Sequence, residues 1–139
     1  MGFTTYTDDN IVNALYGGVA LAVPATLYVG LSSTQPTVAG GNITEPIIGT
    51  NGYTRVAVTN NTTNFPTTSS DAKSNGTAIT FPNSTGAWLS GVALGYFCIY
   101  DASSGGNLLA YAALNSPQAV AGSGSTISFA AGAMTITIN

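Results

Sequence analysis

Beyond Pro24, apolar and polar residues alternate in short runs, and the three-to-four-residue spacing of a helix does not recur. The apolar face of the first run consists of Ala25, Leu27, Val29 and Leu31. Further runs cover residues 53–59, 79–81, 92–101, 108–114, 126–129 and 134–138. Turns rich in Gly, Asn and Ser separate them, which is typical of short antiparallel strands. The pattern predicts an all-β fold, an antiparallel β-sandwich resembling a jelly roll, with one short N-terminal helix.

Two hairpins are predicted within this fold. The first joins residues 92–101 to residues 108–114, and because residues 92–101 are apolar on both faces we expect them to form a central strand. The second hairpin joins residues 126–129 to residues 134–138. Its apolar face consists of Ile127, Phe129, Met134, Ile136 and Ile138. The polar segments 32–51 and 60–76 are predicted to be loops.

The single predicted helix lies before Pro24. It begins at Thr7 or Asp8, where a polar side chain can cap it, and ends at Gly17 and Gly18. Its apolar face is formed by Ile11, Val12, Leu15 and Tyr16. We interpret residues 1–24 as a helical segment of one domain that covers residues 1–139. The apolar face either anchors the protein to a neighbour or caps the open end of its own sandwich, and the sequence leaves both alternatives open.

Only 5% of the residues are charged, with two basic and five acidic side chains. Such a surface has little electrostatic repulsion between copies, which favours a protein that is covered by other subunits in an assembly. A neutral monomeric β-domain is the alternative. Two scattered cations form no basic stripe, so nucleic-acid binding is not expected.

The apolar stretch 11–31 is not expected to cross a membrane, because Asn13, Gly17, Gly18 and Pro24 interrupt it. No cationic segment precedes it, so we expect no signal peptide and a protein that is made in the cytoplasm and used without secretion.

The side chains that enzymes commonly use for catalysis are scarce in this sequence. The chain has no His, and its lone Cys98 lies in an apolar run where a buried thiol is the default. Asp101 opens a turn, as Asp commonly does, and a calcium site built on it is the alternative to this role. No catalytic residue, cofactor or metal site is predicted. Trp88 is a candidate interface residue, with packing at the edge of the core as its alternative.

Four blocks of sequence resemble a known family. They are residues 27–31, residues 51–56, residues 79–82 with Gly86-Ala87-Trp88, and residues 100–111 continuing to residues 128–136. In this order the blocks are similar to small virion proteins of tailed bacteriophages, which include capsid-decoration, minor structural and tail-fibre proteins. The resemblance implies a non-enzymatic structural subunit and supplies no catalytic residue.

The resemblance leads to two hypotheses about the role. The first is a capsid decoration, or cement, protein that binds the major capsid protein lattice on the outside of the head. A homotrimer is then expected, because such proteins commonly sit at threefold positions. The second is a tail or tail-fibre component that binds the host surface. The interface residues expected in either case are Ile11, Val12, Leu15, Tyr16 and Trp88.

Overall fold

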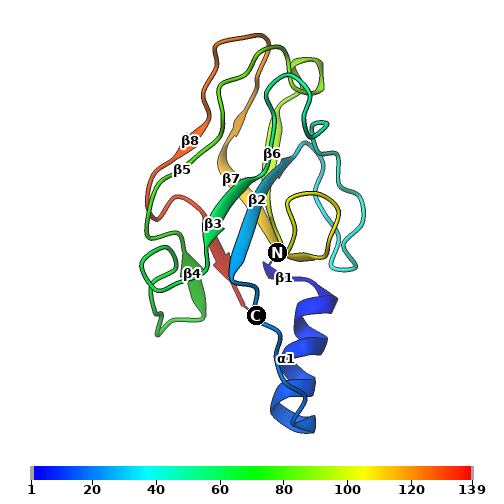
Figure 1. Ribbon diagram of the computed structural model, residues 1–139, viewed down its shortest axis with the longest axis vertical. Coiled ribbons are helices and arrows are strands. Elements are labelled where there is room, and N and C mark those ends of the chain that lie inside the picture. Colours follow the sequence, from blue (N-terminus) through cyan, green and yellow to red (C-terminus); the bar gives the residue numbers. More distant parts are fainter. Residues whose placement is uncertain (1, 139) are drawn as a thin grey trace.

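A computed structural model describes residues 2–138 of the chain. Its elements in chain order are β1 (Gly2–Phe3), α1 (Thr5–Gly17), β2 (Thr26–Ser32), β3 (Val56–Thr59), β4 (Ala72–Ser74), β5 (Ile79–Thr80), the 3-10 turn η1 (Leu89–Gly91), β6 (Leu94–Tyr100), β7 (Leu108–Gln118), β8 (Ser128–Phe129) and β9 (Thr135–Thr137). Five strands form one sheet in the order β1-β7-β6-β2-β3, while β4 pairs with β9 and β5 pairs with β8 (Figure 1).

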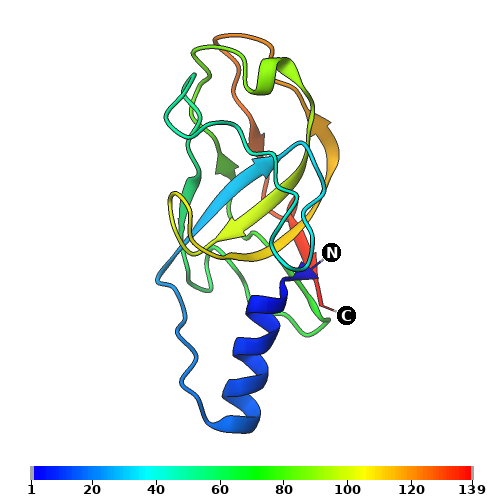
Figure 2. The same ribbon diagram turned by 90° about the vertical axis from the view of Figure 1, so that its right-hand side faces the viewer.

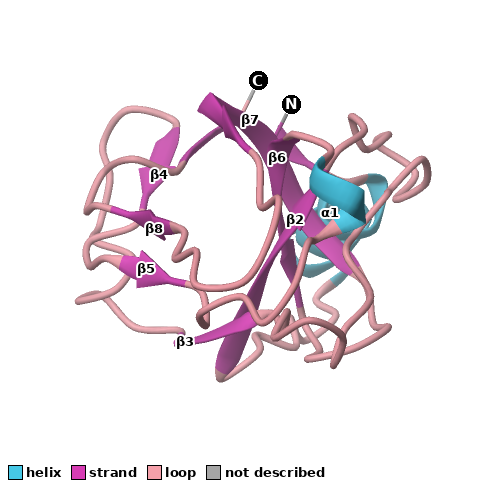
Figure 3. Ribbon diagram, turned by 90° about the horizontal axis from the view of Figure 1, so that it is seen from above, coloured by secondary structure: helices cyan, strands magenta, loops and turns pink. Residues whose placement is uncertain are grey.

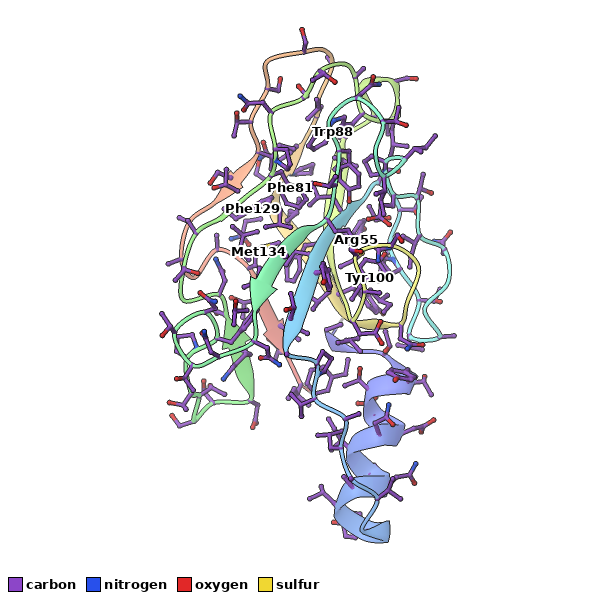
Figure 4. All side chains as sticks on the ribbon, in the orientation of Figure 1. Arg55, Phe81, Trp88, Tyr100, Phe129 and Met134 are labelled. Atoms are coloured by element: carbon purple, nitrogen blue, oxygen red, sulfur yellow. The ribbon has the colours of Figure 1, made fainter. Side chains whose placement is uncertain are left out.

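The two small sheets lie across the core from the five-stranded sheet (Figure 3). Phe81, Trp88, Phe129 and Met134 point into the space between them (Figure 4). Tyr53, Phe81 and Trp88 form the aromatic centre of this core, with ring centroids 5.0 to 6.3 Å apart. The described strands all pair antiparallel, as predicted, and one N-terminal helix is present. The pairings do not show the two four-stranded sheets of a jelly roll.

The prediction that residues 92–101 form a central strand is confirmed. β6 lies in the middle of the five-stranded sheet and forms a hairpin with β7. Its alternate residues Phe97 and Ile99 face the main core, while Cys98 and Tyr100 pack in a second apolar cluster on the other face of the sheet. Ile43, from the loop between β2 and β3, covers that second cluster. Both faces of β6 are therefore buried.

The prediction of a hairpin between residues 126–129 and 134–138 is wrong. β8 pairs with β5, and β9 pairs with β4, a strand in the segment 60–76 that we expected to be a loop. The buried Asn75 explains the difference, because its side chain accepts a hydrogen bond from the Met134 amide and donates to the Ala130 carbonyl. These bonds hold the 130–134 turn beside the end of β4 instead of letting β8 and β9 pair with each other. Ile127, Phe129, Met134 and Ile136 are still buried, as their alternation predicts, whereas Ile138 is 46% exposed.

A buried ion pair joins three separate segments on the second face of the sheet. Arg55 donates to both carboxylate oxygens of Glu45, at 2.9 and 2.8 Å, and the Arg55 side chain is only 5% exposed. Its remaining nitrogen donates to the carbonyls of Ala102 and Gly105 in the turn between β6 and β7. The guanidinium also lies 3.4 Å from the centre of the Tyr100 ring (Figure 4).

Tyr53 connects this ion pair to the sheet. Its hydroxyl donates to Glu45 at 2.8 Å and accepts a hydrogen bond from the Leu31 amide at 3.0 Å. Burial and the negative charge of Glu45 raise the pKa of Tyr53, so the phenol stays protonated and remains a donor. Gly30 makes room for the arrangement, because a Cβ on Gly30 would lie 2.6 Å from a Glu45 carboxylate oxygen.

We expect Arg55→Met to lower the free energy of unfolding by about 3–5 kcal/mol, because it leaves the Glu45 carboxylate buried without its counter-charge. Urea denaturation at one fixed protein concentration measures this loss. Lys73→Met removes the other cation of the chain, and there we expect a change of no more than about 1 kcal/mol. Equal losses in the two variants would show that the ion pair does not hold the segments together.

Candidate interaction surface

Helix α1 projects from one end of the β-body instead of packing on it (Figure 1). Each of its described residues is at least partly exposed. The helix is fastened at its base, since the Thr4 amide and the Thr7 hydroxyl both donate to the Leu109 carbonyl of β7. The rest of α1 therefore extends away from the body.

The predicted cap of α1 at Thr7 or Asp8 is three or four residues too late, because the helix begins at Thr5. The N-cap is Thr4, whose hydroxyl donates to the Leu108 carbonyl of β7 and not to the helix, so the usual capping bond does not mark this end. The C-terminal end is as predicted, because Gly18 adopts the left-handed conformation, with φ 65°, and its amide donates to the Asn13 carbonyl.

After Gly18 the chain returns beside the helix as an extended segment and enters β2 (Figure 2). Asn60 holds the end of this segment by donating to the Pro24 carbonyl at 2.9 Å. We call α1 and the returning segment together the N-terminal arm, residues 5–24.

The arm carries most of the exposed large hydrophobic side chains in the described part of the chain. Within residues 2–138, eleven large hydrophobic side chains are exposed, and seven of them belong to the arm. These seven are Tyr6, Val12, Leu15, Tyr16, Val19, Leu21 and Val23. Leu15 and Tyr16 are the most exposed of the arm, at 71% and 87%. A concentration of this kind marks an interaction surface, whereas single exposed apolar residues need no explanation.

An apolar cavity of about 350 Å³ opens at the same end of the molecule. One wall is formed by the arm, through Ile11 and the residues from Leu21 to Pro24. The floor is formed by the main core, including Phe97, Met134 and Ile136. Three exposed residues of the arm, Tyr6, Leu21 and Val23, also line this cavity, so the arm forms part of its rim.

The structure separates the five interface residues predicted from the sequence. Val12, Leu15 and Tyr16 lie together on the exposed side of α1, while Ile11 is partly buried and lines the cavity. Trp88 lies at the opposite end of the body, 1% exposed, with its indole donating to the Asn51 carbonyl (Figure 4). This burial supports the alternative of core packing for Trp88.

Sequence reasoning missed the apolar residues of the returning segment. Val19, Leu21 and Val23 alternate between Gly18 and Pro24, and this period of two was the available signal. The interruptions of the stretch 11–31 argue against a membrane span, but they do not reveal this alternation. Among the described residues, no helix has the length and hydropathy that crossing a bilayer requires.

The acidic and thiol groups of residues 2–138 do not gather into a cluster of metal ligands. No three His, Cys, Asp or Glu side chains in this range lie close enough together to hold a metal ion. Asp101 accepts hydrogen bonds from the backbone and side-chain nitrogens of Asn107, at 2.7 and 2.8 Å, which is the turn role expected from the sequence. Cys98 is fully buried in the second apolar cluster.

We expect Cys98 to resist alkylation by iodoacetamide at pH 8 in the native protein. Burial raises the pKa of the Cys98 thiol to about 12, so almost none of the reactive thiolate is present at that pH. Mass spectrometry of native and urea-unfolded samples measures the labelling. Rapid labelling of the native protein would contradict the burial of β6 on both faces.

The chain thus combines an antiparallel β-body with an exposed apolar arm. Residues 2–137 match the family described as podophage GP4 fiber I protein gp80. The chain therefore belongs to this phage fibre family, and it is a non-enzymatic structural component of a virion. No curated protein matches the chain.

This membership confirms the resemblance to virion structural proteins of tailed phages. Of the two roles inferred from the sequence, it supports the fibre component and does not support the capsid cement protein.

Proposed function

We propose that the chain is a module of a tail fibre, with the arm end directed toward assembly and the opposite end directed toward the host surface. The observation that carries this proposal is the one-sided distribution of exposed large hydrophobic side chains, because seven of the eleven within residues 2–138 lie on the arm. A fibre module needs one surface that joins it to other subunits and another that stays available.

The loops at the opposite end have the properties of an available polar surface. Residues 81–92 and 119–126 contain none of the seven charged residues of the chain. Hydrogen bonds hold them together, since Ser84 donates to the Gly122 carbonyl and accepts from the Ser125 amide. A loop that is already ordered loses little conformational entropy on binding, and uncharged groups cost less to desolvate than charged ones.

The position in the virion is tested by immunogold electron microscopy with an antibody against this chain. We expect gold particles along the fibres of intact phage. Labelling of the head lattice instead would contradict the proposal and would support a capsid decoration protein bound to the major capsid protein. The homotrimer inferred from the resemblance stays a prediction under either outcome.

Host-surface contact is tested with phage that carry Ser123→Glu in the loop opposite the arm. We expect adsorption to slow by at least about tenfold, because the new charge must be desolvated when the loop binds. Ser103→Glu is the matched control, since Ser103 is equally a surface serine but lies in the turn between β6 and β7. Equal adsorption by both variants would exclude a contact through this loop.

A further inference from the structure

We propose that the partner of the N-terminal arm is the arm end of a second copy of this chain. The inference rests on the proposed function only in assigning the arm end to assembly. It concerns the isolated protein, so it can be tested without the virion.

Helix α1 lacks enough support from its own chain. Its 13 residues include several weak helix formers, such as Thr, Asn, Asp, Val and Ile, and none of them is buried. Isolated helices of this length are marginal in water, and most helices in proteins depend on the burial of one face. A face that could supply this burial is present on α1, but the chain itself does not cover it.

The exposed side chains of the arm have a geometry that suits pairing with a second copy. Val12, Leu15 and Tyr16 follow one another at helical spacing on the exposed side of α1. Val19, Leu21 and Val23 recur at a period of two in the segment beside it. The same end of the molecule thus presents a helical ridge, an extended apolar strip and the mouth of the cavity. A surface that carries both projecting and receiving parts can pair with a symmetry-related copy of itself.

The exposed apolar surface of the arm is large enough for a stable interface. The seven exposed hydrophobic side chains of the arm are between 45% and 87% exposed. Together these seven residues expose roughly 800 Å², which is on the order of the area that each partner buries in an interface of standard size. A second copy that covers most of the arm therefore buries an area that approaches that of a standard interface.

Electrostatic repulsion between two copies of the arm is weak. Asp8 and Asp9 are the charged residues of the arm, and the whole chain has a net charge of -3. Identical chains with so few charges repel one another weakly. The exposed apolar face can be covered by a second copy without burying a large number of like charges.

The test is the molar mass of the purified full chain by sedimentation equilibrium across the micromolar range. We expect wild type to sediment as a dimer or a larger closed assembly. Leu15→Asp should weaken association by at least about thirty-fold, the effect of losing a central interface residue. Ile47→Asp is the matched control, because Ile47 is 72% exposed and Leu15 is 71% exposed, but Ile47 lies outside the arm.

Near-ultraviolet circular dichroism from the buried Tyr53 and Trp88 shows whether each variant is folded. If Leu15→Asp fails to fold, Leu21→Asp places the charge on the returning segment, outside the helix, and the same weakening is expected. A wild-type monomer at all concentrations overturns the inference, and so does a folded arm variant that associates as strongly as Ile47→Asp.

The outcomes also separate this inference from the proposed function. If the purified protein is an oligomer but the antibody labels only phage heads, the fibre role is contradicted and the arm interface stands. If the purified protein is a monomer and the antibody labels the fibres, the fibre role stands and the arm interface is contradicted.

Discussion

The buried pair of Arg55 and Glu45 is the interaction on which the second face of the five-stranded sheet depends. It joins the long loop after β2, the residue just before β3 and the turn between β6 and β7. The chain has only two cations and five acidic residues, and the ion pair between Arg55 and Glu45 lies where three segments meet. Because both partners are largely desolvated, each one depends on the other and on the hydrogen bonds that surround them.

Most of the rest of the body is held by apolar packing and by hydrogen bonds between uncharged groups. Tyr53 joins the two systems, since its ring packs against Phe81 and Trp88 while its hydroxyl bonds to Glu45. Asn75 has a comparable role for the small sheets, where its amide fixes the turn before β9. The body can therefore be rigid while its surface remains almost uncharged. The exposed large hydrophobic residues in the described part of the chain are concentrated on the arm, outside this body.

The sequence predicts those parts of the fold that are determined locally. The alternation in β2 and the turn between β6 and β7 are continuous in the chain, so pattern reasoning finds them. The partners of β8 and β9 are set by distant contacts, above all by Asn75, and a strand of two or three residues carries too little pattern to reveal them. The exposed stripe of Val12, Leu15 and Tyr16 was predictable from helical spacing, whereas its continuation in residues 19–23 required knowledge of how the chain returns.

Hydrogen exchange of the α1 amides is the measurement that decides whether a second copy covers the arm, because exchange reports whether a helix is stabilised. If the arm is covered, the amides of residues 9–17 will be protected in concentrated protein and will lose protection on dilution. If they exchange at every concentration as fast as in Leu15→Asp, the arm is not held by a second copy and the proposed assembly is wrong.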